Sequence, residues 1–155
     1  MSANTLGLNF GIILSMDCQF CKIIIDKHER IVKETKFSFT MLSNPKLMDG
    51  HLLVIPKRHI EKPSELTAEE RKDIFDEVIN LQEKILEKIS PGCDICEHYR
   101  PFIPDNKFKV SHLHFHLRPR FLDDELYKKV QIYEKDIFQD LRQNEWNKYR
   151  EILSS

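Results

Sequence analysis

The stretch 112–120 constrains the fold more than any other part of this sequence, because it reads His-Leu-His-Phe-His-Leu-Arg-Pro-Arg. Histidine alternates with an apolar residue three times, and this period of two is typical of a β-strand with one face in a core. The apolar residues expected to face the core are Leu113, Phe115 and Leu117. The histidines expected in a row on the opposite face are His112, His114 and His116. Pro119 has no backbone N–H, so we expect the strand to end there.

The spacing of these histidines limits what they can do together. Neighbouring histidines on one face of a strand lie about 6.6 Å apart, and the outer two about 13 Å apart. A zinc–nitrogen bond measures only about 2.0–2.1 Å, so the three rings will not converge on one ion. At least one histidine therefore has another role, and imidazole is suited to nucleophilic or acid–base catalysis near neutral pH.

Size and composition narrow the class of protein. The 155 residues are enough for one domain with a substantial core, and the net charge of −1 gives no strong signal for nucleic-acid binding. No apolar run is long enough to span a membrane. Residues 1–16 carry no charged side chain and lack the basic region and cleavage site of a signal peptide, so we predict an N-terminal extension. We expect a cytoplasmic protein with reduced cysteines.

Two C-x-x-C pairs account for all four cysteines of the chain. Such a pair either supplies soft thiolate ligands to zinc or exchanges disulfides. The disulfide-exchange function belongs to a βαβ setting, and the segments that follow the first pair favour antiparallel strands instead. Zinc binding is therefore the favoured interpretation for the first pair, Cys18 and Cys21.

The segments before the second pair predict strands and one long helix. Residues 30–35 and 37–42 favour a β-hairpin, and residues 51–56 favour a buried strand that ends at a proline. Thr67 and Glu70 form a capping box, and apolar residues then recur at helical spacing up to Pro91-Gly92. This pattern predicts a long helix that packs across the sheet.

The remaining segments complete an α+β fold. Residues 93–102 favour another strand, and residues 107–117 are expected to return antiparallel to it and carry the histidines. Residues 123–155 favour a C-terminal helical extension with an apolar stripe for core or dimer packing. The stripe consists of Leu126, Val130, Tyr133, Ile137 and Leu141. The expected sheet has about five strands.

The histidine stretch and the block 50–59 resemble the histidine triad (HIT) family of nucleotide hydrolases and transferases, in its zinc-bearing branch. The similarity covers residues 18–120, and it implies a catalytic domain over residues 17–122. It also implies an antiparallel sheet crossed by one long helix, and a homodimer whose sheets join edge to edge. The implied ligand is a small nucleotide substrate.

The resemblance implies roles for individual residues. His114, the middle histidine, would attack the α-phosphorus of a nucleotide. His116 would bind a phosphate oxygen or the leaving group, and His51 would support it from a neighbouring strand. The cations placed to meet phosphate are Lys109, Arg118 and Arg120, although ordinary surface charge is an equal alternative for the two arginines. His28 and His98 receive no role.

The resemblance also implies a structural zinc site. Its four ligands would be Cys18, Cys21, His59 and His112. The competing set uses the four cysteines and replaces the histidines by Cys93 and Cys96. We favour the set with two histidines, because the two cysteine pairs are separated by far more residues than in a zinc ribbon.

The function implied by the resemblance is hydrolysis or transfer of a nucleotidyl group through a nucleotidyl-histidine intermediate, on phosphoramidates or dinucleoside polyphosphates. Phe108 and Lys109 stand where family members usually have a glutamine and a hydroxyl, and no acid lies near Leu42, where many have a ribose-binding aspartate. The alternative is therefore a zinc-stabilised nucleotide-binding module with lost or weak catalysis. A metal-dependent hydrolase ranks last, because carboxylate ligands are missing near the histidines.

Overall fold

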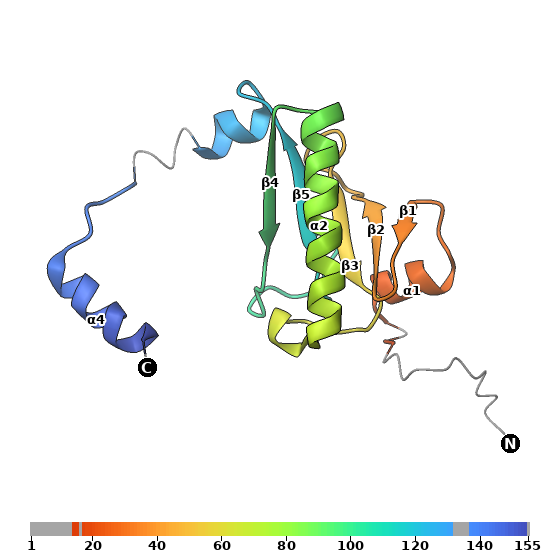
Figure 1. Cartoon of the computed structure of the whole chain (residues 1–155), viewed down its shortest axis with the longest axis horizontal. Coiled ribbons are helices and arrows are strands. Elements are labelled where there is room, and N and C mark those ends of the chain that lie inside the picture. The colour runs from red at the N-terminus through yellow and green to blue at the C-terminus, as the bar shows by residue number, and fades with distance from the viewer. Residues whose placement is uncertain (1–13, 16, 132–136, 155) are drawn as a thin grey trace, which may run out of the picture. The chain divides into compact units, whose positions relative to one another are not determined.

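The computed structural model describes residues 14–15, 17–131 and 137–154. It contains two units, Met1–Phe121 and Leu122–Ser155. The first unit is built on a five-stranded antiparallel sheet in the order β1-β2-β3-β5-β4, with one long helix, α2 (Ala68–Lys88), across it (Figure 1). The strands are β1 (Ile31–Glu34), β2 (Ser38–Leu42), β3 (Leu52–Pro56), β4 (Gly92–Glu97) and β5 (Phe115–Arg120). The predicted α+β class and the predicted five strands are confirmed.

The turn before β3 needs a glycine. Gly50 has a φ of +74°, a left-handed conformation that side chains with a Cβ disfavour. A Cβ at this position would also lie 3.1 Å from Cγ of Pro119. The turn therefore brings the start of β3 close to the end of β5. These two strands are neighbours in the sheet.

Helix α2 (Ala68–Lys88) begins at the predicted capping box. The Thr67 hydroxyl accepts a hydrogen bond from Glu70 N at 3.2 Å, and the Glu70 carboxylate accepts one from Thr67 N at 2.8 Å. Arg58 donates two hydrogen bonds to the same carboxylate, at 2.9 and 2.8 Å. These bonds, chiefly those from Arg58, lower the pKa of Glu70 to about 2. The start of the helix is thus tied to the segment that follows β3.

The sheet is covered on both faces, and β3 shows how the sequence achieves this. Leu52 and Val54 belong to the core under α2, together with Leu113, Phe115 and Leu117, which the sequence predicted to face inward. Leu53 and Ile55 belong to a second core on the opposite face. That second core includes residues of a short helix, α1 (Gln19–Ile25), preceded by Cys18. Because β3 is buried on both faces, its residues are almost all apolar.

Both ends of β5 differ from the predictions. Strand β5 starts only at Phe115, because Leu113 N donates to the Ile60 carbonyl at 2.6 Å and so pairs with a loop instead of a strand. The expected end at Pro119 is also wrong, since β5 continues to Arg120. Pairing with β3 stops at Leu117, so beyond it β5 is paired on the β4 side alone and tolerates a proline.

Strand β4 is shorter than predicted. It ends at Glu97 instead of continuing to Phe102, and residues 98–114 form an irregular connection to β5. A 3₁₀ turn at Pro63–Glu65, η1, precedes α2.

The second unit is helical, as predicted. It contains η2 (Tyr127–Gln131), which has π-helical hydrogen bonding, and α4 (Gln143–Leu153). Ile137 and Leu141 of the predicted apolar stripe are exposed, and Tyr133 lies outside the described residues. Most of the predicted N-terminal extension, 1–16, also lies outside them. Within the described ranges, no helix combines the length and the apolarity needed to cross a membrane.

Candidate active site

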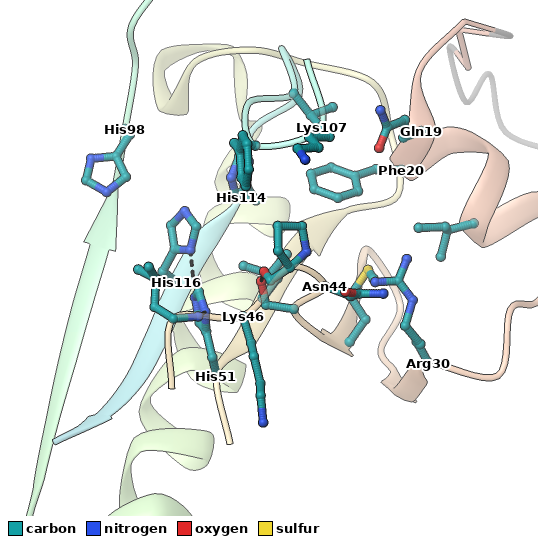
Figure 2. A pocket seen from close by; sticks show the side chains of 18 of the residues that line it. Gln19, Phe20, Arg30, Asn44, Lys46, His51, His98, Lys107, His114 and His116 are labelled. Carbon is teal, nitrogen blue, oxygen red and sulfur yellow. Dashed lines mark hydrogen bonds between the residues drawn. The ribbon is translucent and has the colours of Figure 1, made fainter. Parts of the chain in front are cut away.

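A pocket of about 320 Å³ opens on the face of the sheet that carries α1 (Figure 2). Phe20 of α1, the loop between β2 and β3, the loop between β4 and β5, and β5 itself all contribute to its lining. Three histidines proposed from the sequence line it: His51, His114 and His116. His116 reaches this face because it pairs with Leu53, whose side chain lies in the core on the α1 side.

The backbone fixes which ring nitrogen of His114 faces the pocket. The Nδ1 atom lies 2.7 Å from the carbonyl oxygen of His112. A carbonyl oxygen only accepts, so Nδ1–H donates and Nε2 carries the lone pair in the neutral ring. The ring of Phe20 packs edge-on against His114, with centroids 5.2 Å apart. His114 is therefore held in one orientation with a free nucleophilic nitrogen.

His51 and His116 form a chain of hydrogen bonds with a defined direction. Leu47 N–H donates to His51 Nδ1 at 3.3 Å, so the proton of the neutral His51 ring sits on Nε2. His51 Nε2 lies 2.9 Å from His116 Nδ1, marked by the dashed line in Figure 2, and donates to it. His116 Nδ1 is thus an acceptor, which leaves Nε2–H of His116 as a donor to another group.

Burial keeps these rings neutral. It lowers the pKa of His51 to about 4, with smaller contributions from Arg118 and His114. It also lowers the pKa of His116 to about 2, and the neighbouring His114 and Arg118 act in the same direction. Burial likewise lowers the pKa of His114, opposed by its bond to the His112 carbonyl. The directions of the hydrogen bonds given above therefore hold near pH 7.

The pocket is suited to an anion. Among the described residues that line it, none is an aspartate or a glutamate. It contains five cationic side chains: Arg30, Lys46, Arg100, Lys107 and Arg118. In a partly buried site such charges attract phosphate groups strongly.

Of the three cations selected from the sequence, only Arg118 lines this pocket. Lys109 instead donates to Asp105 at 2.8 Å and to the Ser111 hydroxyl at 2.6 Å, within its own loop. Arg120 forms an ion pair with Asp94 of β4. The positions of Lys109 and Arg120 therefore give no support to their predicted role as substrate-binding cations.

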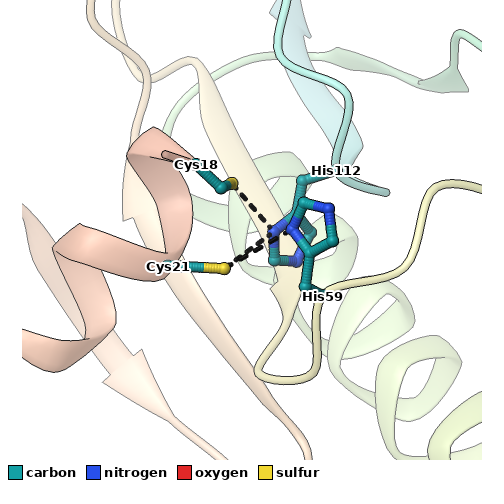
Figure 3. Close-up of side chains that lie close together, drawn as sticks. All are labelled: Cys18, Cys21, His59 and His112. Carbon is teal, nitrogen blue, oxygen red and sulfur yellow. Dashed lines mark hydrogen bonds between the residues drawn. The ribbon is translucent and has the colours of Figure 1, made fainter. Parts of the chain in front are cut away.

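The four residues proposed as zinc ligands lie close together (Figure 3). One ligand atom from each lies within 4.8 Å of the others. Cys18 Sγ is 3.3 Å from His112 Nδ1, and Cys21 Sγ is 3.5 Å from His59 Nδ1 and 3.7 Å from His112 Nδ1. A sulfur ligand and a nitrogen ligand of one tetrahedral zinc ion lie about 3.6 Å apart. The sulfur–nitrogen distances in this cluster therefore fit a bound metal ion.

The tautomer of His112 also fits metal binding. Its Nε2 lies 2.9 Å from the Pro56 carbonyl oxygen, to which Nε2–H must donate. The lone pair therefore sits on Nδ1, which faces the two sulfurs. A backbone carbonyl that orients a histidine in this way is a common partner of metal-binding imidazoles.

The structure contradicts the four-cysteine alternative. Cys93 packs against the core under α2, whereas Cys18 and Cys21 belong to the core on the other face of the sheet. Cys96 Sγ lies 3.7 Å from His98 Nε2 instead. The sheet thus separates Cys93 from Cys18 and Cys21, and Cys96 contacts His98 instead of joining their cluster.

His98 and Arg100 are among the pocket residues that received no role from the sequence. They follow β4 directly, and Cys96 pairs with His116 in the sheet, so the chain reaches the histidines just after β4 ends. To find them from the sequence, one would have to know that β4 lies beside β5, the strand that carries His116.

Comparison with known proteins identifies the family. The family model described as HIT domain matches residues 26–123. The chain belongs to the HIT family. The match covers the sheet, α2 and all three histidines of the signature stretch.

The curated relatives with named activities include two proteins of Schizosaccharomyces pombe. An adenosine 5'-monophosphoramidase of Schizosaccharomyces pombe is 33% identical over 109 residues, which cover 68% of this chain and 75% of that protein. An asymmetrical bis(5'-nucleosyl)-tetraphosphatase of the same organism is 29% identical over 119 residues, covering 76% of this chain and 60% of that one. Another, longer relative is covered over only 27% of its length. These HIT relatives support nucleotide hydrolase activity at a general level.

The fold also matches solved HIT-like structures. A crystal structure of a Streptococcus mutans protein superimposes with a TM-score of 0.70 at 24% identity, covering 99% of this chain and 91% of that one. This similarity supports the fold alone.

Proposed function

We propose that this HIT protein cleaves nucleotides at the α-phosphorus through a covalent nucleotidyl intermediate on His114. The observation that carries the proposal is the tautomer of His114, whose Nε2 lone pair is left free in a pocket lined by cations. The named activities of its relatives, on a phosphoramidate and on a dinucleoside tetraphosphate, fit this class of chemistry.

In the first step, the Nε2 lone pair of His114 forms a bond to the α-phosphorus, and the bond from phosphorus to the leaving group breaks. A phosphate leaving group departs with the electron pair of that bond and needs no proton. The His114 ring becomes cationic while its Nδ1–H remains bonded to the His112 carbonyl, which stabilises the positive charge.

In the second step, water attacks the phosphorus and the P–N bond breaks. The electron pair of the P–N bond returns to Nε2 of His114, and the nucleoside monophosphate leaves. One proton of the attacking water passes to solvent. An acceptor other than water would give nucleotidyl transfer in place of hydrolysis. In both steps, His116 donates its Nε2–H to a phosphate oxygen, and His51 holds it in the tautomer that makes this possible.

We propose that the cluster of Cys18, Cys21, His59 and His112 holds a structural zinc ion. Two thiolates and two imidazoles complete a tetrahedral set, so the ion would stabilise the fold without an open position for water. The cluster would fix α1 and the start of the histidine stretch against each other, which keeps Phe20 against His114.

We also propose the homodimer and the cytoplasmic location that the sequence suggested. Strand β4 is at the edge of the sheet, and α2 exposes apolar side chains. These are Phe75, Ile79 and Leu86. The four cysteines form no disulfide, which fits a reducing compartment.

The test is a search for the covalent intermediate. The protein is mixed with a panel of nucleotides, with magnesium chelated, and quenched within milliseconds to seconds for intact-mass analysis. We expect a mass increase of one nucleotidyl group, absent from the His114→Ala variant, and release of the nucleoside monophosphate. Binding of nucleotides with neither an adduct nor turnover would instead identify a binding module.

A further inference from the structure

Three side chains beyond His116 form a cluster that the proposed mechanism leaves without a role. Arg118 Nη2 lies 3.2 Å from Nε2 of His98, and Arg100 Nη2 lies 3.3 Å from Nδ1 of the same ring. Each ring nitrogen of His98 therefore faces a guanidinium group. All three side chains line the pocket, and His98 is labelled in Figure 2 beside His116.

This cluster has fewer hydrogen-bond acceptors than its two guanidinium groups require. Guanidinium nitrogens only donate, and a neutral imidazole has a single lone pair, so His98 satisfies one of the two arginines. Burial lowers the pKa of His98, and Arg100, Arg118 and His114 lower it further, so protonation of the ring is disfavoured as well.

Among the described residues, the guanidinium group of Arg118 has too few acceptors. Its Nε is buried from solvent and makes no hydrogen bond within the described part of the chain. Asp94, which is opposite Arg118 in the β4–β5 pairing, forms its ion pair with Arg120. A buried guanidinium nitrogen without an acceptor is costly, and oxygen atoms of an anion would satisfy it.

The cluster is next to the catalytic histidines. The rings of His98 and His116 have centroids 5.4 Å apart, and those of His116 and His114 are 4.8 Å apart. An anion at the cluster would thus lie next to His116, where a phosphate of the leaving group could reach it.

We infer that Arg100, Arg118 and His98 form a second anion subsite that binds a phosphate of the leaving group, an inference that rests on the proposed function. The arginines donate to the phosphate oxygens, and His98 orients both of them. The preferred substrate is then a nucleotide joined through a phosphoanhydride to at least one further phosphate. A nucleotide with a neutral amine as leaving group would leave the subsite empty.

Binding of an inorganic probe tests the subsite without any turnover. Calorimetric titration of the full chain with tripolyphosphate should give saturable binding that weakens about tenfold or more in Arg118→Leu and in Arg100→Gln. Arg118→Lys keeps the charge and should recover part of the affinity. The matched control is Lys84→Gln, which removes an exposed charge from α2 and should bind like the wild type. Arg100 is exposed in a loop, so its variant tests the inference even if Arg118→Leu fails to fold.

Kinetics test the position of the subsite. In Arg118→Leu, the ratio of kcat/KM for diadenosine tetraphosphate to kcat/KM for adenosine 5'-phosphoramidate should fall about tenfold or more. Equal losses on both substrates would overturn the assignment to the leaving group. Tripolyphosphate that does not bind, or that binds the variants as tightly as the wild type, would overturn the subsite itself. If the wild type turns over neither nucleotide, the proposed function fails, while the tripolyphosphate titration still decides whether the anion subsite exists.

Discussion

His112 and His114 are two residues apart, yet they present opposite ring nitrogens to their surroundings. His112 donates from Nε2 to the Pro56 carbonyl, so its Nδ1 lone pair faces the cysteines. His114 donates from Nδ1 to the His112 carbonyl, so its Nε2 lone pair faces the pocket. For each ring, one backbone carbonyl oxygen decides which nitrogen keeps the lone pair. His112 is thereby suited to bind a metal ion, and His114 is suited to act as a nucleophile. Residue type alone does not distinguish these roles; the hydrogen-bond partner does.

The strongest test of this distinction removes the proposed nucleophile. His114→Ala should lower kcat for nucleotide hydrolysis by at least about 10³-fold, because the proposed covalent intermediate forms on Nε2 of this ring. Thermal unfolding should change little by comparison. The control is His28→Ala, which removes an exposed histidine outside both clusters and should keep wild-type kcat. Full activity in His114→Ala would show that the nucleophile is a different group.

The corresponding change in the other cluster should act on stability. Cys21→Ser should lower the metal content below one zinc per chain and lower Tm by about 5 °C or more, since an ion bound only by the folded chain stabilises it. Elemental analysis and thermal unfolding measure the two effects. Cys93→Ser is the matched control, because Cys93 lies outside the cluster and should leave the zinc content unchanged. A wild-type protein that purifies without metal and shows the same Tm as Cys21→Ser would refute the zinc proposal.

The neutral state of the pocket histidines predicts a pH dependence of stability. The pKa of His51 lies at about 4 in the folded chain against an ordinary value of 6.5. Above pH 6.5 the ring is neutral in both states. As the pH falls from 6.5 toward 4, the unfolded chain binds the proton first and the free energy of unfolding declines.

We therefore expect His51→Gln to lose less stability than the wild type between pH 6.5 and pH 5, by about 1–2 kcal/mol. Urea denaturation at a series of pH values measures this difference. His28→Gln serves as the control and should follow the wild-type curve. Parallel curves for the wild type and His51→Gln would mean that His51 titrates alike in the folded and unfolded chains.

The smallest expected effect concerns the residue that contacts both histidines. Phe20 packs edge-on against His112 and His114, with centroids 5.8 and 5.2 Å apart. Phe20→Leu should cost about 1 kcal/mol of stability and lower kcat about two- to fivefold, because both rings lose an orienting contact. Phe102→Leu, a change at an exposed loop position, should affect neither measurement. A Phe20→Leu effect confined to stability would show that the ring serves the core alone.

Much of the scaffold follows from local patterns. The hairpin of β1 and β2, the buried strand β3 and the capping box of α2 were predicted, since turns, apolar runs and caps depend on residues close together in the chain. The predicted boundaries of β5 were wrong, because they depend on where β3 stops pairing and on a bond to Ile60. The alternation of apolar and polar residues predicts which face of a strand is buried, but not how far the neighbouring strands pair with it.

The candidate site divides in the same way. The histidines of the signature stretch and the cysteine pair were found from spacing and resemblance, and the structure brings them together in the two expected groups. Lys109 and Arg120 were chosen because they are near the histidines in sequence, but each has an acidic partner of its own. His98 and Arg100 reach the pocket from another strand, which sequence distance does not indicate.

The sequence by itself determined the family, the α+β class and the residue types available for chemistry, because alternation, capping and motif spacing are local properties of the chain. The tertiary structure alone decided which nitrogen of each histidine carries the lone pair and which cations line the pocket. The physical reason is that a tautomer is set by its hydrogen-bond partner and a pocket by the packing of several strands. In this protein, the Pro56 carbonyl reaches His112 and the His98 ring reaches Arg118 only when the sheet forms.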